Sequence, residues 1–173
     1  QVTKVWADAR GASRAKLLTP YLAPTTEVLT MYITLTPPLD IKTLCESPVN
    51  ELCPLTFATS LTPEEYGTLS KALAKSRKEM LEDLPNPNDR AIHFSMGHVD
   101  RPGIRSHPTS PSGEAFVMFI IIGWQSVEAH KRARETVQFK ENFWPVSDKM
   151  LPTGAGLLPG SGWGMSHVKF HEL

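Results

Sequence analysis

The chain has 173 residues, of which 40% are apolar and 21% charged, and this length and composition suit one globular domain with its own core. Lysine plus arginine equals aspartate plus glutamate, at 18 each, so no net charge draws the chain to nucleic acid or an anionic membrane. The longest apolar run, residues 115–124, is about half the length of a membrane-spanning helix. We therefore expect neither nucleic acid nor a membrane as a partner. The cytoplasm is the favoured location, with secretion left open.

The first 26 residues predict an arm that precedes the domain. They carry four basic side chains against one acidic side chain, Asp8, and Pro20 and Pro24 favour an extended exit. We expect residues 27–173 to form a single domain and the arm to cross to a partner subunit.

Alternating apolar and polar residues predict strands over 27–35, 91–99, 115–124 and 162–173. In 115–124 both alternate sets are apolar, so this strand must be covered on both faces. The proline-rich stretch 36–62 is expected to be irregular. Residues 100–114, with three prolines and two glycines, are expected to form a long loop and a candidate lid.

Two helices are predicted. Thr62 as N-cap, Pro63 in the first turn and Glu65 three residues after the cap start the first helix, which "PNPND" ends. The second runs from Ser126 to about residue 142, with His130 on its apolar stripe. A short helical piece is expected after it, in residues 143–152.

The order β-α-β-β-α-β predicts an α+β, ferredoxin-like fold, with a four-stranded antiparallel sheet and both helices on one face. The other face of the sheet would then be bare and apolar. This predicts a homodimer with the two sheets packed face to face.

The remaining motifs point to no metal and no nucleophile. Cys45 and Cys53 are close enough for a local disulfide, although two free thiols are favoured. No His, Cys, Asp or Glu spacing is typical of a metal site, and no hydrolase signature is present. The glycine-rich stretch 153–162 matches no phosphate-binding pattern.

The segment "FIIIGWQSVEAHKRARETVQFKE", residues 119–141, and the closing "MSHVKF" resemble the antibiotic biosynthesis monooxygenase superfamily, the latter its fungal members. The resemblance implies a dimeric α+β barrel over residues 27–173. It also implies a small-molecule function in secondary metabolism, such as cofactor-free oxygenation, polyketide cyclisation or isomerisation. Haem is disfavoured, because Asn142 and Phe143 stand where the haem-degrading members place their axial histidine.

These patterns lead to one functional hypothesis and one alternative. The hypothesis is histidine acid/base chemistry, without a cofactor, on an aromatic or polyketide-like molecule held between sheet and helices. His130 would be the base and His167 a second acid or base. Residues expected to contact the substrate are Tyr32, Trp124, His93, Phe94, Met118 and Trp163. The alternative is a non-catalytic, ligand-binding or stress-related dimer, in which the histidines are structural. A cavity that reaches His130 favours the enzyme, whereas a closed core around a fully hydrogen-bonded His130 favours the alternative.

Overall fold

The computed structural model describes residues 20, 31–101, 103–152 and 165–172. The chain divides into two compact units, Gln1–Met31 and Tyr32–Leu173, and the fold below is that of the second. The predicted arm, apart from Pro20, and Trp163 lie outside the described residues.

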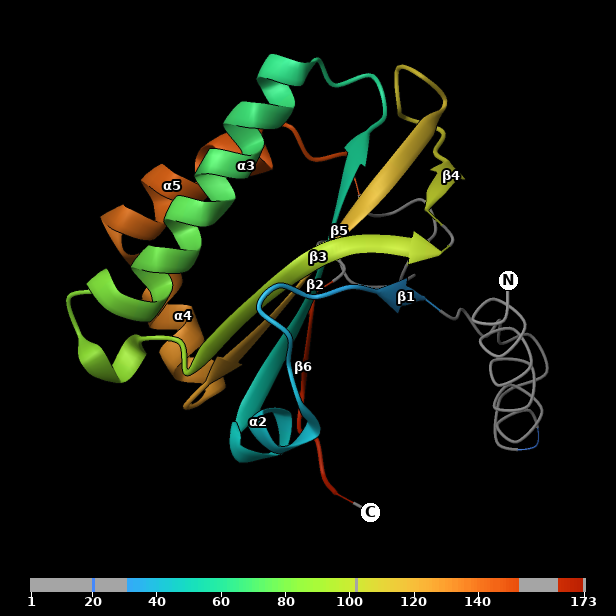
Figure 1. Ribbon diagram of the computed structural model, residues 1–173. Coiled ribbons are helices and arrows are strands. Elements are labelled where there is room, and N and C mark those ends of the chain that lie inside the picture. Colours follow the sequence, from blue (N-terminus) through green and yellow to red (C-terminus); the bar gives the residue numbers. More distant parts are fainter. Residues whose placement is uncertain (1–19, 21–30, 102, 153–164, 173) are drawn as a thin grey trace. The chain divides into compact units, whose positions relative to one another are not determined.

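The second unit is α+β, built on one curled antiparallel sheet, consistent with a ferredoxin-like fold (Figure 1). The described strands are β1 (Tyr32–Ile33), β2 (Val49–Ala58), β3 (His93–Arg101), β4 (Ile104–Ser106), β5 (Glu114–Trp124) and β6 (Ser166–Val168). Their order across the sheet is β1-β3-β5-β2-β6, with β4 also paired to β5. The fully apolar β5 is therefore central, between β2 and β3 over most of its length.

Three helices cover one face of the sheet: α3 (Pro63–Lys78), α4 (Val127–Glu135) and α5 (Val137–Ser147) (Figure 1). A short helix, α2 (Ile41–Glu46), precedes β2. The predicted start of α3 is confirmed: the Glu65 amide donates to Thr62 Oγ1 at 3.2 Å, and the Thr62 amide donates to the Glu65 carboxylate at 2.9 Å. The core between helices and sheet includes Leu55, Phe57, Leu69, Leu73 and Ile120.

The first core strand is not where the sequence pattern placed it. Residues 27–30 lie outside the described part, and β1 is a two-residue edge strand paired with β3. The corresponding core strand is β2, inside the stretch expected to be irregular. Pro54 in the middle of β2 accounts for the error, because a proline argues against a central strand. It is accommodated because β2 pairs with β6 only over Asn50–Leu52, before the proline is reached.

The second helix is two helices. Thr136 ends α4 and also caps α5, since its hydroxyl accepts from the Phe139 amide at 3.2 Å. The helix α5 then continues through Pro145 to Ser147, so it joins the end of the predicted helix to the short helical piece expected after residue 142. In the predicted long loop, Ile104–Ser106 pairs with β5, so this segment is partly strand.

The second face of the sheet is not bare. Val117, Phe119 and Ile121, which point away from the helices, are only 3%, 6% and 9% exposed within the single chain. On this face the Ser95 hydroxyl donates to the Pro37 carbonyl, and a Cβ at Gly97 would meet the Thr34 carbonyl. The argument from an uncovered face to a dimer is therefore wrong for this structure.

Two smaller observations complete the fold. Cys45 and Cys53 are both free thiols. No helix in the described residues combines the length and apolar character needed to cross a bilayer.

Candidate active site

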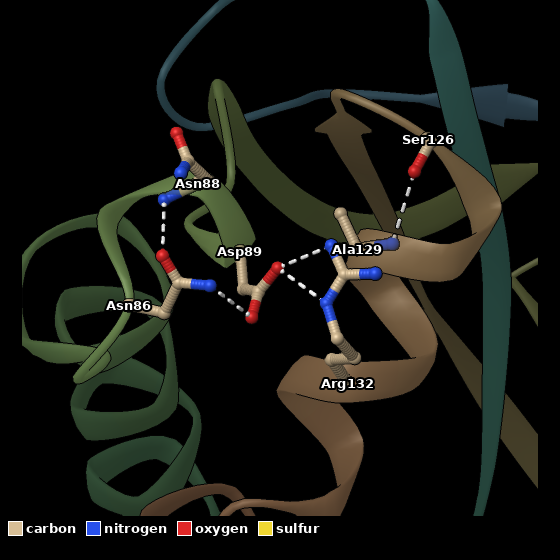
Figure 2. Close-up of polar contacts among 6 residues, drawn as sticks. All are labelled: Asn86, Asn88, Asp89, Ser126, Ala129 and Arg132. Atoms are coloured by element: carbon tan, nitrogen blue, oxygen red, sulfur yellow. Dashed lines mark hydrogen bonds and ion pairs between the residues drawn. The ribbon is translucent and has the colours of Figure 1, made fainter.

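Two sets of polar contacts fix the position of α4, one at its N-terminal end and one about a turn later (Figure 2). At its start, the Ser126 hydroxyl accepts from the Ala129 amide at 3.0 Å. One turn later, Arg132 Nε and a terminal guanidinium nitrogen donate to Asp89 Oδ1 at 2.9 and 2.6 Å. Asn86 donates to the other oxygen of Asp89. These contacts tie the outer side of α4 to the segment before β3, and the opposite side carries His130 towards the sheet.

Strand register places Glu51 at the centre of the site. Glu51 on β2 lies opposite Ile122 on β5 and opposite His167 on β6, and Ile122 in turn lies opposite Phe94 on β3. Directly opposed residues point to the same face of a sheet, so this row faces the helices. Glu51 and His167 are therefore cross-strand neighbours beneath α4.

His130 bridges these two neighbours. Its Nδ1 lies 2.8 Å from His167 Nε2, a hydrogen bond in which one ring donates and the other accepts. Its Nε2 lies 3.5 Å from Glu51 Oε2, beyond the usual 2.7–3.2 Å of an N–H···O bond. Because His167 is exposed and His130 is only 2% exposed, the three side chains form a path from the protein surface to a buried carboxyl group.

Trp124 holds the buried end of this path. Its indole stacks on the His130 ring, with centroids 4.9 Å apart and planes 15° from parallel. Its Nε1–H donates to Glu51 Oε2 at 2.9 Å. Trp124 is fully buried, and it therefore orients both the imidazole and the carboxyl group.

Burial sets the protonation of the path. Desolvation raises the pKa of Glu51 from 4.5 to about 7, against the opposing effects of the Trp124 hydrogen bond and the Arg134 charge. Desolvation, with smaller contributions from His167 and Arg134, lowers the pKa of His130 from 6.5 to about 3. The pKa of His167 is also lowered, by burial first and then by Lys131 and Arg134. Near pH 6 His130 is thus neutral and Glu51 is mostly protonated, and burial also favours the neutral form of His167.

A cavity of about 270 Å³ lies between the sheet and the helices, and Glu51 and His130 both line it. Its floor is formed by β2, β3 and β5, and its roof by α3, α4, α5 and the π-helical turn that follows α3. Most of the lining is apolar and includes Leu55, Leu73, Met80, Phe94, Phe139 and Phe143. The volume lies near the lower end of the roughly 300–1,000 Å³ typical of ligand pockets. A molecule of one or two rings suits it better than an extended polyketide.

The predicted site residues divide into two groups. His130 and Phe94 line the cavity, while Trp124 and His167 contact His130 behind its wall. Tyr32 lies on the edge strand β1, and Met118 lies in the core, both outside the lining.

His93 faces the other side of the sheet. Its Nε2–H donates to Asn50 Oδ1 at 3.0 Å, because the Asn50 amide group already donates to the Leu44 carbonyl. His93 is therefore separated from the cavity by the sheet itself.

Sequence reasoning missed Glu51, Ser76 and Arg134, which all line the cavity. For Glu51 a signal existed: once 49–58 is taken as a strand, Glu51 alternates with Cys53, Leu55 and Phe57, which places a carboxyl group on an otherwise apolar face. In the described part of the chain, no three His, Cys, Asp or Glu side chains converge in a way that could hold a metal.

Comparisons with known proteins add little to this geometry. No protein-family model matches the chain, and no curated protein matches it. Among solved structures, one similar chain is described as an antibiotic biosynthesis monooxygenase from Nitrosomonas europaea. The identity is 12% over 69% of this chain and 93% of that chain, with a TM-score of 0.36. A likeness of this size bears on neither substrate nor mechanism.

Proposed function

We propose that the chain is an enzyme that removes and returns a proton on a small aromatic molecule held in the cavity, with Glu51 as the acid/base. The observation that carries the proposal is the row of Glu51, His130 and the exposed His167, in which His130 lies 3.5 Å from the carboxyl group and is hydrogen-bonded to His167. A group that only fills a core needs no such connection to solvent.

Glu51 suits the contact with substrate better than His130 does. Both nitrogens of His130 already face protein groups, His167 on one side and Glu51 on the other. An acid/base works best when its pKa lies near the working pH, and the pKa of Glu51 is raised to about 7. This revises the sequence hypothesis, in which His130 was the base.

His130 then acts as a positioning and relay group. A neutral imidazole can accept a proton at one nitrogen while it releases another from the second nitrogen, so it passes a proton without holding a net charge for long. His167 exchanges that proton with water. Glu51 could thus be reset between turnovers although it is buried.

The chemistry would begin at an acidic C–H bond of the substrate. That bond breaks, its proton moves to the Glu51 carboxylate, and the electron pair stays on the substrate. Return of the proton to a different carbon is an isomerisation, and attack of the carbanion on a carbonyl of the same molecule is a ring closure. Reaction of the carbanion with dioxygen, as the family resemblance implies, would start with the same proton transfer. No cofactor enters these steps.

Hydrogen–deuterium exchange tests the proposal without a known product. A panel of one- and two-ring carbon acids, such as aryl ketones and aryl β-dicarbonyls, is incubated in D₂O and followed by NMR. The wild-type protein should catalyse exchange in at least one compound. Glu51→Gln should slow that exchange by about a hundredfold or more, the range for loss of a general base. Glu82→Gln, an exposed glutamate after α3, is the matched control and should exchange at the wild-type rate.

Two results would count against the proposal. Unchanged exchange in Glu51→Gln would remove Glu51 from the chemistry. Binding of panel compounds without exchange of any of them would favour the non-catalytic, ligand-binding alternative.

The homodimer, the crossing arm and a place in secondary metabolism stay proposals beside this one. Sedimentation of the full chain as a monomer would contradict the dimer.

A further inference from the structure

One cation of the cavity wall, Arg134, forms no direct ion pair with any residue that the structure describes, although its charge acts on Glu51 and Glu135. Arg134 follows His130 by one helical turn on α4 and lines the cavity. Within the part of the chain that the structure describes, its guanidinium makes neither a hydrogen bond nor an ion pair. The other charged lining residues of the helices, Glu135 and Lys140, pair with each other at 2.8 Å. With Glu51 protonated, the wall therefore carries a net charge of one positive unit.

A second polar group on the wall also lacks a protein partner. Ser76 on α3 lines the cavity and is only 3% exposed. Its hydroxyl has no hydrogen-bond partner among the described residues. Its oxygen is closed off from solvent in the ligand-free chain. A buried hydroxyl without a partner is unfavourable, so rotation of the Ser76 side chain towards an oxygen or nitrogen atom of a ligand would be favoured.

The rest of the wall suits an apolar, flat body. Phe139 and Phe143 stack on each other with ring centroids 5.4 Å apart, and both line the cavity. Trp144, also a lining residue, is 71% exposed and offers an aromatic face where the cavity meets solvent. Arg134, likewise exposed, is placed to meet a charged group that stays partly hydrated.

We propose that the cavity binds a small aromatic organic anion, with its charged oxygen against Arg134, its ring among the apolar side chains and a second polar atom at Ser76. The role in catalysis that this inference gives to Arg134 rests on the proposed function. When Glu51 takes a proton from a carbon next to a carbonyl, the C–H bond breaks and its electron pair moves onto the carbonyl oxygen. The anion held during turnover is therefore this enolate, with its oxygen against Arg134, and its charge disappears when Glu51 returns the proton.

Binding of two acid and amide pairs tests this inference independently of turnover. Benzoate and benzamide, and 2-naphthoate and 2-naphthamide, are titrated into the full chain at pH 6 by calorimetry. Each pair differs in charge and scarcely in size. The wild-type protein should bind at least one carboxylate about tenfold or more tightly than its amide, the gain expected from a charge-assisted hydrogen bond.

Arg134→Gln should reduce this preference to within about twofold, because glutamine can offer the carboxylate only a neutral hydrogen bond. Lys71→Gln is the matched control, because Lys71 is an exposed cation on α3 that does not line the cavity. It should keep the wild-type preference. Raising the pH above 7 should weaken carboxylate binding to the wild type, as Glu51 ionises, but not to Glu51→Gln.

Three results would overturn the inference: equal binding of acid and amide, an unchanged preference in Arg134→Gln, or no binding of either carboxylate. The proposed function fails separately. If carboxylates are preferred but no carbon acid exchanges, the anion site stands and the enzyme does not. If exchange occurs in Arg134→Gln at the wild-type rate and with the wild-type affinity, the enzyme stands and the anion site does not.

Discussion

Removing either member of the buried pair Glu51 and His130 should make the stability of the protein depend on pH in a way that the wild type lacks. Stability should change with pH in opposite directions in the two variants. In the folded chain between pH 4.5 and 6.5 the pair holds one proton, on Glu51. In the unfolded chain it also holds one proton in this range, on the histidine, because the ordinary pKa values are 4.5 and 6.5. Because the folded and unfolded chains hold equal numbers of protons, the pair does not make the free energy of unfolding depend on pH in this range.

In Glu51→Gln only the histidine titrates. Its pKa is depressed in the folded state, so the unfolded chain takes up a proton below pH 6.5 and the folded chain does not until about pH 3. Stability relative to wild type should then fall as pH falls, by about 1.4 kcal/mol per unit and about 2.7 kcal/mol from pH 6.5 to 4.5.

In His130→Phe, which keeps a ring against Trp124, only the carboxyl group titrates. Its pKa is raised in the folded state, so the unfolded chain loses its proton from pH 4.5 upwards and the folded chain keeps it to about pH 7. Stability relative to wild type should fall as pH rises, by a similar amount, about 2.7 kcal/mol, over the same two units.

Urea unfolding followed by tryptophan fluorescence, at half-unit pH steps from 4.5 to 6.5, measures these slopes. Other titrating groups cancel when the wild-type curve is subtracted. Glu82→Gln, exposed and outside the site, should follow the wild type. The reasoning is refuted if both variants run parallel to the wild type, or if Glu51→Gln becomes more stable as the pH falls.

Two further predictions concern groups that contact the pair or the cavity. Trp124→Phe removes the hydrogen bond that lowers the pKa of Glu51, so that pKa should rise above about 7. A carboxyl-carbon NMR titration measures it, and a pKa at or below the wild-type value would contradict the assignment. Ser76→Ala should stabilise the ligand-free protein by about 0.5 to 2 kcal/mol, because alanine is the better helix former and the lost hydroxyl has no protein partner. Urea unfolding checks this, and a loss of stability would mean that the hydroxyl has a partner.

The parts of the fold that the sequence predicted are those with strong local patterns. The capping box of Thr62 and Glu65 defined the start of α3 because its hydrogen bonds join residues three apart. Likewise β5 was recognisable from its continuous apolar run. Where two local rules conflicted, prediction failed: Pro54 outweighed the alternation of β2, although tertiary pairing with β5 continues past it without a register shift.

The candidate site was predicted in part for the same reason. His130 was recognised because its place on the apolar stripe of α4 is a local property, and His167 because it alternates along a strand. Their direct contact, and their contact with Glu51, depend on the order of strands in the sheet. That order brings together β2 and β6 from opposite ends of the domain, which no local pattern reveals.

The energetics of Glu51 argue that this carboxyl group is not there to hold the fold together. Above pH 7 its ionised form is buried, and the rise of its pKa from 4.5 to about 7 corresponds to a cost of about 3 kcal/mol relative to the unfolded chain. A leucine on the same face of β2, between the neighbours Ile122 and His167, would bury apolar surface without that cost. An acid that weakens the fold, lines a cavity and lies beside two histidines that lead to solvent therefore supports the proposal of proton transfer at Glu51. Loss of function on its removal should therefore be accompanied, above pH 7, by a gain rather than a loss of stability.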